Sequence, residues 1–147
     1  MLIFPYLTIP VSGYLVAWQY YQMPHNDSWG DTHVTVWRSE GDKYHLISDI
    51  VLTPDNKTSG GQRFQYVHNE VMRVKQGDYI GVYATGDGGR NIVSMSSNDP
   101  TEKLVKILNE DIYQGQQSLT KGGFSDGGKR DVSLRAFVAG KHSIYHW

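Results

Sequence analysis

Hydrophobic and polar residues alternate with a period of two over much of the chain, which is the pattern of β-strands with one buried face. In residues 33–38, for example, Val34 and Val36 fall on one face of a strand, opposite Thr35 and Trp37. Short strands of this kind are predicted at residues 14–21, 33–38, 44–53, 63–67, 71–74, 79–84, 92–95 and 132–138.

Glycine, asparagine and aspartate separate these segments, as expected for tight turns between antiparallel strands. Gly41 and Asp42 form a hairpin signal, and Gly77 with Asp78 marks a further turn. Gly81 stands inside a predicted strand, which indicates either a bulge or a close backbone contact at that position.

Residues 100–109 depart from the strand pattern. Asp99, Pro100 and Glu102 suit the N-cap, first and third positions of a helix, and Leu104 and Ile107 follow at helical spacing. We expect a short helix near 100–109. A strand is the alternative, because tertiary contacts override local propensity in short segments.

The strands recur at intervals of roughly 8–12 residues, which favours an antiparallel β-sandwich of the jelly-roll kind, and hence an all-β fold. The length of 147 residues suits one domain covering residues 1–147. The side chains expected to face a common core between the two sheets are Val16, Trp18, Tyr20, Val34, Val36, Ile80, Val82, Leu134 and Ala136.

Composition and charge argue against several classes of function. The net charge of -1 argues against a nucleic-acid-binding protein, which needs a basic stripe to grip phosphates. No apolar run approaches the roughly 20 residues that span a bilayer, so we expect no membrane insertion. Cysteine is absent, which excludes disulfides, thiolate metal sites and a cysteine nucleophile.

Residue patterns of two common hydrolase classes are missing. His142 and His146 enclose no glutamate, unlike the zinc-binding helix of metallopeptidases. No two glutamates stand two residues apart in a predicted strand, where they could form a glycosidase pair. We therefore expect a protein that is not an enzyme, although a catalytic group assembled only in three dimensions would escape this test.

Trp29 suggests a ligand site. It stands in a polar loop, where an indole ring can cover the apolar face of a sugar while carboxylates and amides bond its hydroxyl groups. A second loop carries acidic, amide and guanidinium groups beside glycines that let the backbone approach a ligand. The candidate carbohydrate-binding residues of the two loops are Asp27, Trp29, Asp31, Asp87, Arg90 and Asn91. Two alternatives remain. Trp29 folds back to cap the end of the sandwich, or the two loops lie at opposite ends and each is merely a polar turn.

Residues 87–95 resemble residues 126–134 without gaps, and each segment begins with Asp-Gly-Gly. They represent two similar hairpin turns or two equivalent loops at one end of the sandwich. In the second case the turn at 126–130 would add a third wall to the site.

Five aspartates in turn-like segments could supply oxygen ligands for Ca²⁺, although aspartate also favours turns through its own hydrogen bonds. They are Asp27, Asp31, Asp87, Asp126 and Asp131. No Asp-x-Asp-x-Asp-Gly spacing occurs, so the cofactor is left open with Ca²⁺ as the candidate.

Three motifs together carry a resemblance: GYLVAWQYY at 13–21, VTVWR at 34–38 and VKQGDYIGVY at 74–83, with VSLRA at 132–136 as a fitting last strand. This order resembles β-sandwich modules of large extracellular proteins of invertebrates. The resemblance implies an extracellular, lectin-like module for adhesion or glycan binding.

The leading hypothesis is a non-catalytic extracellular module that binds a glycan or glycoprotein through the loops at one end of the sandwich. The alternative is a structural or protein–protein adhesion module of a larger assembly, which uses a sheet face or edge. Whether the chain forms a homo-oligomer is left open.

Overall fold

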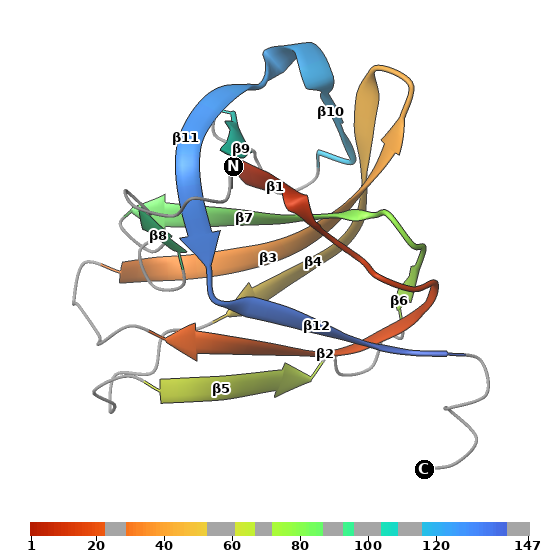
Figure 1. The fold of residues 1–147 in the computed structure, drawn as a ribbon, viewed down its shortest axis with the longest axis vertical. Helices are drawn as coiled ribbons and strands as arrows, with labels where there is room; N and C mark the ends of the chain where they lie inside the picture. Colours follow the sequence, from red (N-terminus) through yellow and green to blue (C-terminus); the bar gives the residue numbers. More distant parts are fainter. Residues whose placement is uncertain are drawn as a thin grey trace.

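The protein is an all-β, sandwich-like molecule of two antiparallel sheets that are not closed, which confirms the predicted fold class (Figure 1). The computed structural model describes residues 1–22, 29–52, 61–66, 72–86, 93–95, 104–108 and 116–140. The larger sheet has the order β10 (Ser118–Thr120), β4 (Lys43–Leu52), β3 (Trp29–Glu40), β7 (Tyr79–Gly86), β1 (Leu2–Thr8), β9 (Leu104–Ile107), β11 (Ser125–Val132) and β8 (Val93–Met95). The smaller sheet has the order β12 (Leu134–Ala139), β2 (Gly13–Gln22) and β5 (Gly61–Tyr66), with β6 (Met72–Val74) also paired to β2.

The main hydrophobic core lies between the two sheets. Most side chains expected there are present, and β12 adds half-buried ones that pack against them. Each large apolar side chain buried in this way contributes roughly 1.5–3 kcal/mol to stability. The buried members come from β1, β2, β3, β4, β6, β7 and the segment after β1: Phe4, Ile9, Leu15, Trp18, Tyr20, Val34, Val36, Leu52, Val74, Ile80 and Val82.

Val16 is the exception to the predicted core, because it is half-buried and is not part of the cluster. The pairing of β2 with β12 passes from Ala17–Phe137 directly to Leu15–Val138, so Val16 is an extra residue that forms a bulge. The bulge shifts the alternation of β2 and turns Leu15 into the core in its place.

The larger sheet curls strongly. Its strands β10 and β11 stand six positions apart, which would be about 29 Å in a flat sheet. Residues 121–124, which include the 3₁₀ turn Lys121–Gly123, are the whole connection between them and can span at most about 18 Å. The bend of β11 towards β10 at the top of Figure 1 follows from this short connection.

The inner surface of the curl holds a second hydrophobic cluster of Ile3, Trp37 and Leu119. Trp37 is 1% exposed, although the sequence places it on the face opposite the main core. The rings of Tyr44 and Phe124, with centroids 5.4 Å apart, pack against this cluster. Both faces of the larger sheet are therefore buried in part.

Gly81 lies where this second cluster presses on the sheet. Its pairing with Ile3 and Thr35 is continuous, so the glycine marks a close contact and not a bulge. A Cβ at this position would lie 2.8 Å from Thr35 Oγ1 and 3.2 Å from Trp37 Nε1. The indole, whose Nε1 donates to Thr35 Oγ1 at 2.7 Å, packs closely because residue 81 has no side chain.

The prediction of a helix near 100–109 is wrong for the residues that the structure describes there, since Leu104–Ile107 is strand β9. Residues 100–103 and 109 lie outside the described residues. Strand β9 pairs with β1 and β11, so ladder hydrogen bonds on both sides override the local helical pattern.

Two other segments differ from the sequence prediction. Residues 126–130, expected as a turn, belong to strand β11, although the pairing register shifts between Asp126 and Lys129. Strand β1 was not predicted because Pro5 interrupts it; its pairs with β7 stop at Phe4 and resume at Thr8, which leaves the proline outside the ladder.

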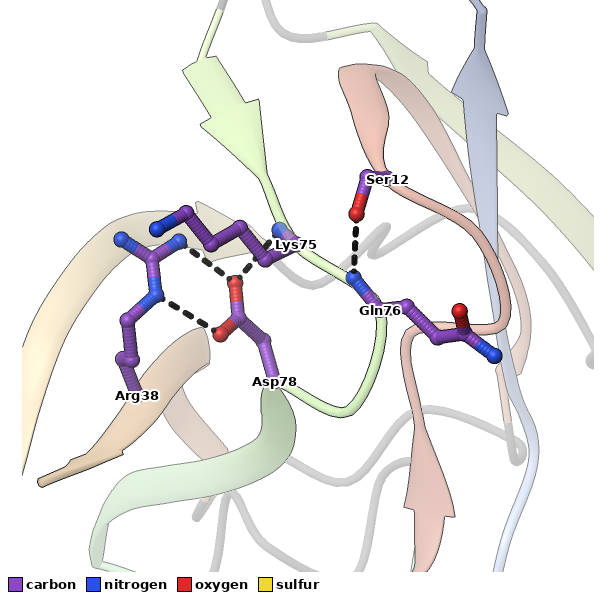
Figure 2. A network of polar contacts seen from close by, with 5 residues as sticks. All are labelled: Ser12, Arg38, Lys75, Gln76 and Asp78. Atoms are coloured by element: carbon purple, nitrogen blue, oxygen red, sulfur yellow. Dashed lines mark hydrogen bonds and ion pairs between the residues drawn. The ribbon is translucent and has the colours of Figure 1, made fainter.

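Arg38 and Asp78 tie β3 to the turn before β7 (Figure 2). Arg38 donates from Nε to Asp78 Oδ1 at 3.0 Å and from Nη2 to Oδ2 at 2.9 Å. Oδ2 also accepts from the backbone N–H of Lys75 at 2.8 Å, and Ser12 Oγ accepts from the backbone N–H of Gln76 at 2.9 Å. The carboxylate thereby holds both the turn and the strand. Its hydrogen bonds raise the pKa of Arg38.

Candidate functional site

Two of the six predicted binding residues fall in the described part of the chain. Trp29 and Asp31 belong to the backbone of β3, whereas Asp27, Asp87, Arg90 and Asn91 lie outside the described residues. Trp29 and Asp31 were expected in a loop, and that expectation is wrong for their backbone. The pairing with β7 extends the strand as far as Trp29 through a register shift before Thr32.

Trp29 pairs across the sheet with Gly86, the last residue of β7. Strand β3 therefore begins beside the point where β7 ends, at the left of the larger sheet in Figure 1. Asp87 follows Gly86 directly in the sequence, and Asp27 precedes Trp29 by two residues. The two predicted binding loops are thus attached to neighbouring strands at one end of the sheet.

A polar cluster lies near this end of the sheet, four residues after Trp29 along β3. It consists of His33 of β3, Asp49 of β4 and Tyr83 of β7. His33 Nδ1 donates to Asp49 Oδ1 at 2.8 Å, and the His33 and Tyr83 ring centroids are 5.5 Å apart. The register explains the meeting, because His33 pairs with Tyr83 of β7 and with Val51 of β4, two residues from Asp49. Each of the three strands β3, β4 and β7 therefore contributes one side chain to the cluster.

The hydrogen bond to Asp49 decides which tautomer the neutral imidazole takes. An ionised carboxylate only accepts hydrogen bonds, so Nδ1 of His33 carries a proton, and in the neutral ring Nε2 is then an acceptor. Among the residues that the structure describes, no group hydrogen-bonds this Nε2. His33 is 6% exposed, while the Asp49 side chain is 36% exposed and brings the cluster to the surface.

Sequence reasoning did not single out His33 or Asp49. A signal was present, since His33 shares its strand face with Thr35 and Trp37 and thus stands on a face that proves to be buried. A buried polar side chain needs a hydrogen-bond partner. The partner could not be identified from the sequence, because it depends on the register of β3 against β4.

The aspartates considered for Ca²⁺ are described only in part, since Asp27 and Asp87 lie outside the described residues. Asp126 is exposed on β11, and the backbone of Asp131 pairs with Ser94 of β8. Across the described ranges, no three or more histidine, cysteine, aspartate or glutamate side chains are grouped to hold a metal ion.

Comparisons of the chain with protein-family models, with curated proteins and with solved structures find no match. The resemblance to invertebrate extracellular modules stays a prediction. Within the described residues, no helix has the length and apolar character needed to cross a bilayer.

Proposed function

We propose that the protein is a non-catalytic, extracellular binding module that recognises a glycan at the end of the larger sheet where β3 begins and β7 ends. The observation that carries this proposal is the backbone pair between Trp29 and Gly86. It supports a common site because the loops with the predicted sugar-binding residues adjoin these two positions in the sequence.

The chemistry of the neighbouring cluster fits the same ligand. A sugar hydroxyl can donate to His33 Nε2 while Asp49 holds the ring from the other side at 2.8 Å. Tyr83 adds an aromatic surface beside His33, and an indole at position 29 would add a second. His33 and Asp49 serve here as a ligand contact and its support, with no proton transfer to a reacting bond.

The test begins with a glycan array, probed with and without a calcium chelator. Binding to the best glycan is then titrated for Trp29→Ala and for His33→Asn, which keeps a donor for Asp49 but removes the acceptor at Nε2. Tyr21→Ala is the matched control, because Tyr21 is 44% exposed on the other sheet. Circular dichroism monitors folding of each variant.

We expect Trp29→Ala and His33→Asn to abolish or strongly weaken binding with an unchanged melting temperature, and Tyr21→Ala to bind normally. Unchanged glycan binding by both site variants would overturn the proposal. Turnover of a glycoside or ester that His33→Asn abolishes would replace a binding module with an enzyme.

A further inference from the structure

The outer face of the smaller sheet carries arginine and aromatic side chains together. Trp18 and Tyr20 of β2 point into the core, so the intervening Gln19 and the following Tyr21 lie on the outer face. Cross-strand partners share a face, which places Arg135 of β12 beside Gln19. We define the outer face by Tyr14, Gln19, Tyr21, Arg73, Arg135 and Phe137.

Each arginine of the outer face is stacked on a ring. The guanidinium carbon of Arg73 lies 5.6 Å from the centroid of Tyr14, and Arg73 Nη2 donates to the Tyr14 hydroxyl at 3.1 Å. The guanidinium carbon of Arg135 lies 5.7 Å from the centroid of Phe137. Stacking holds both guanidinium groups in place, so less side-chain entropy is lost when they bind a partner.

The charge of the outer face selects the partner. Its described charged side chains are Arg73 and Arg135, and no described carboxylate forms an ion pair with either. Each fork of N–H donors matches a carboxylate. Each arginine lies over one face of its ring, Tyr14 or Phe137, and therefore competes with a sugar for stacking on that face. Exposed Tyr21 lies diagonally across from Arg135, which pairs with Gln19, and an exposed tyrosine near an arginine is typical of protein interfaces.

We propose that the outer face of the smaller sheet binds an acidic segment of a partner protein, with carboxylates paired to Arg73 and Arg135. This surface lies on the opposite sheet from the proposed glycan site and does not depend on it. It would allow the module to bind two ligands at once, one at the end of β3 and β7 and one on the outer face.

The experiment measures binding of biotinylated poly-L-glutamate to the whole chain by biolayer interferometry at about 50 mM salt, where exposed charges are weakly screened. The variants are Arg73→Met, Arg135→Met and the double variant. Lys43→Met is the matched control, because it removes one exposed positive charge from β4 of the other sheet. Dextran sulfate is the second probe.

We expect each single variant to weaken poly-L-glutamate binding about fivefold and the double variant about 25-fold, as for two independent exposed ion pairs. Lys43→Met should bind within about twofold of the original chain, and binding should fall as salt rises. Equal losses in Lys43→Met and Arg135→Met would overturn the proposal, because the attraction would then be unspecific. Arginine-dependent binding of dextran sulfate without binding of poly-L-glutamate would overturn it in favour of a sulfated glycan. Arg73→Met and Arg135→Met should keep glycan binding, which separates this test from the previous one.

Discussion

The Arg38–Asp78 pair is predicted to be the main polar link between β3 and the turn before β7. Asp78→Ala removes the acceptor of two arginine donors, at 3.0 and 2.9 Å, and of the Lys75 N–H at 2.8 Å. The Asp78 side chain is 3% exposed and that of Arg38 is 24% exposed. The carboxylate is thus dehydrated in the fold, while the guanidinium keeps some contact with water.

Loss of one partner of a buried ion pair costs about 3–5 kcal/mol. Because Arg38 stays partly hydrated, we expect the lower end of the range for Asp78→Ala, about 3 kcal/mol, with the lost turn hydrogen bond included. Arg38→Met should cost about as much, since it leaves a buried carboxylate without its counter-charge. The double variant leaves neither charge unpaired, so it should cost about 4 kcal/mol instead of the sum of about 6.

The assay is urea unfolding followed by circular dichroism, with free energies from linear extrapolation. Arg135→Met is the control, because Arg135 is an exposed arginine without a described carboxylate partner, and it should change stability little. A coupling energy near 2 kcal/mol supports the reasoning. A coupling energy below about 0.5 kcal/mol, meaning that the two single effects simply add, would refute it.

The pH dependence that Arg38 contributes to stability follows from the direction of its pKa shift. Hydrogen bonding to Asp78 raises the pKa of Arg38 in the folded state. Because this pKa is higher in the folded than in the unfolded state, protonated Arg38 stabilises the fold at pH values below its unfolded-state pKa. This contribution is lost only as the pH rises through its folded-state pKa. Both values lie at the alkaline extreme, so the arginine adds no pH dependence between about pH 5 and 9.

Two further predictions concern packing. Gly81→Ala should destabilise the protein by about 1–3 kcal/mol, because its Cβ would lie 2.8 Å from Thr35 Oγ1 and 2.9 Å from the Leu2 carbonyl oxygen. Gly122→Ala, where a Cβ meets nothing within 4 Å, is the control, and equal urea midpoints for the two variants would contradict the close contact. Trp18→Ala should cost about 3–5 kcal/mol, whereas Trp18→Phe should cost clearly less, since the phenyl ring still fills much of the space that the buried indole occupies. Similar costs for both Trp18 variants, again from urea unfolding, would contradict this packing argument.

The local pattern was sufficient to predict most strands and the main core. Alternation in β3 separates Val34 and Val36 from Thr35 and Trp37, and the structure places the two pairs on opposite faces. Gly41, with φ of 58°, forms the predicted turn between β3 and β4. Such features depend on residues within a few positions of one another, so they can be predicted without knowledge of the fold.

Contacts between distant segments decided the rest. The bulge at Val16 depends on the pairing of β2 with β12, and the strand at Leu104–Ile107 depends on pairing with β1 and β11. Trp37 is buried because the short connection after β10 curls the larger sheet over it. His33 acquires its role in the candidate site from the register of β3 against β4 and β7. In each case the partner lies far away in the sequence, and the free energy of pairing and burial exceeds the local preference of a few residues.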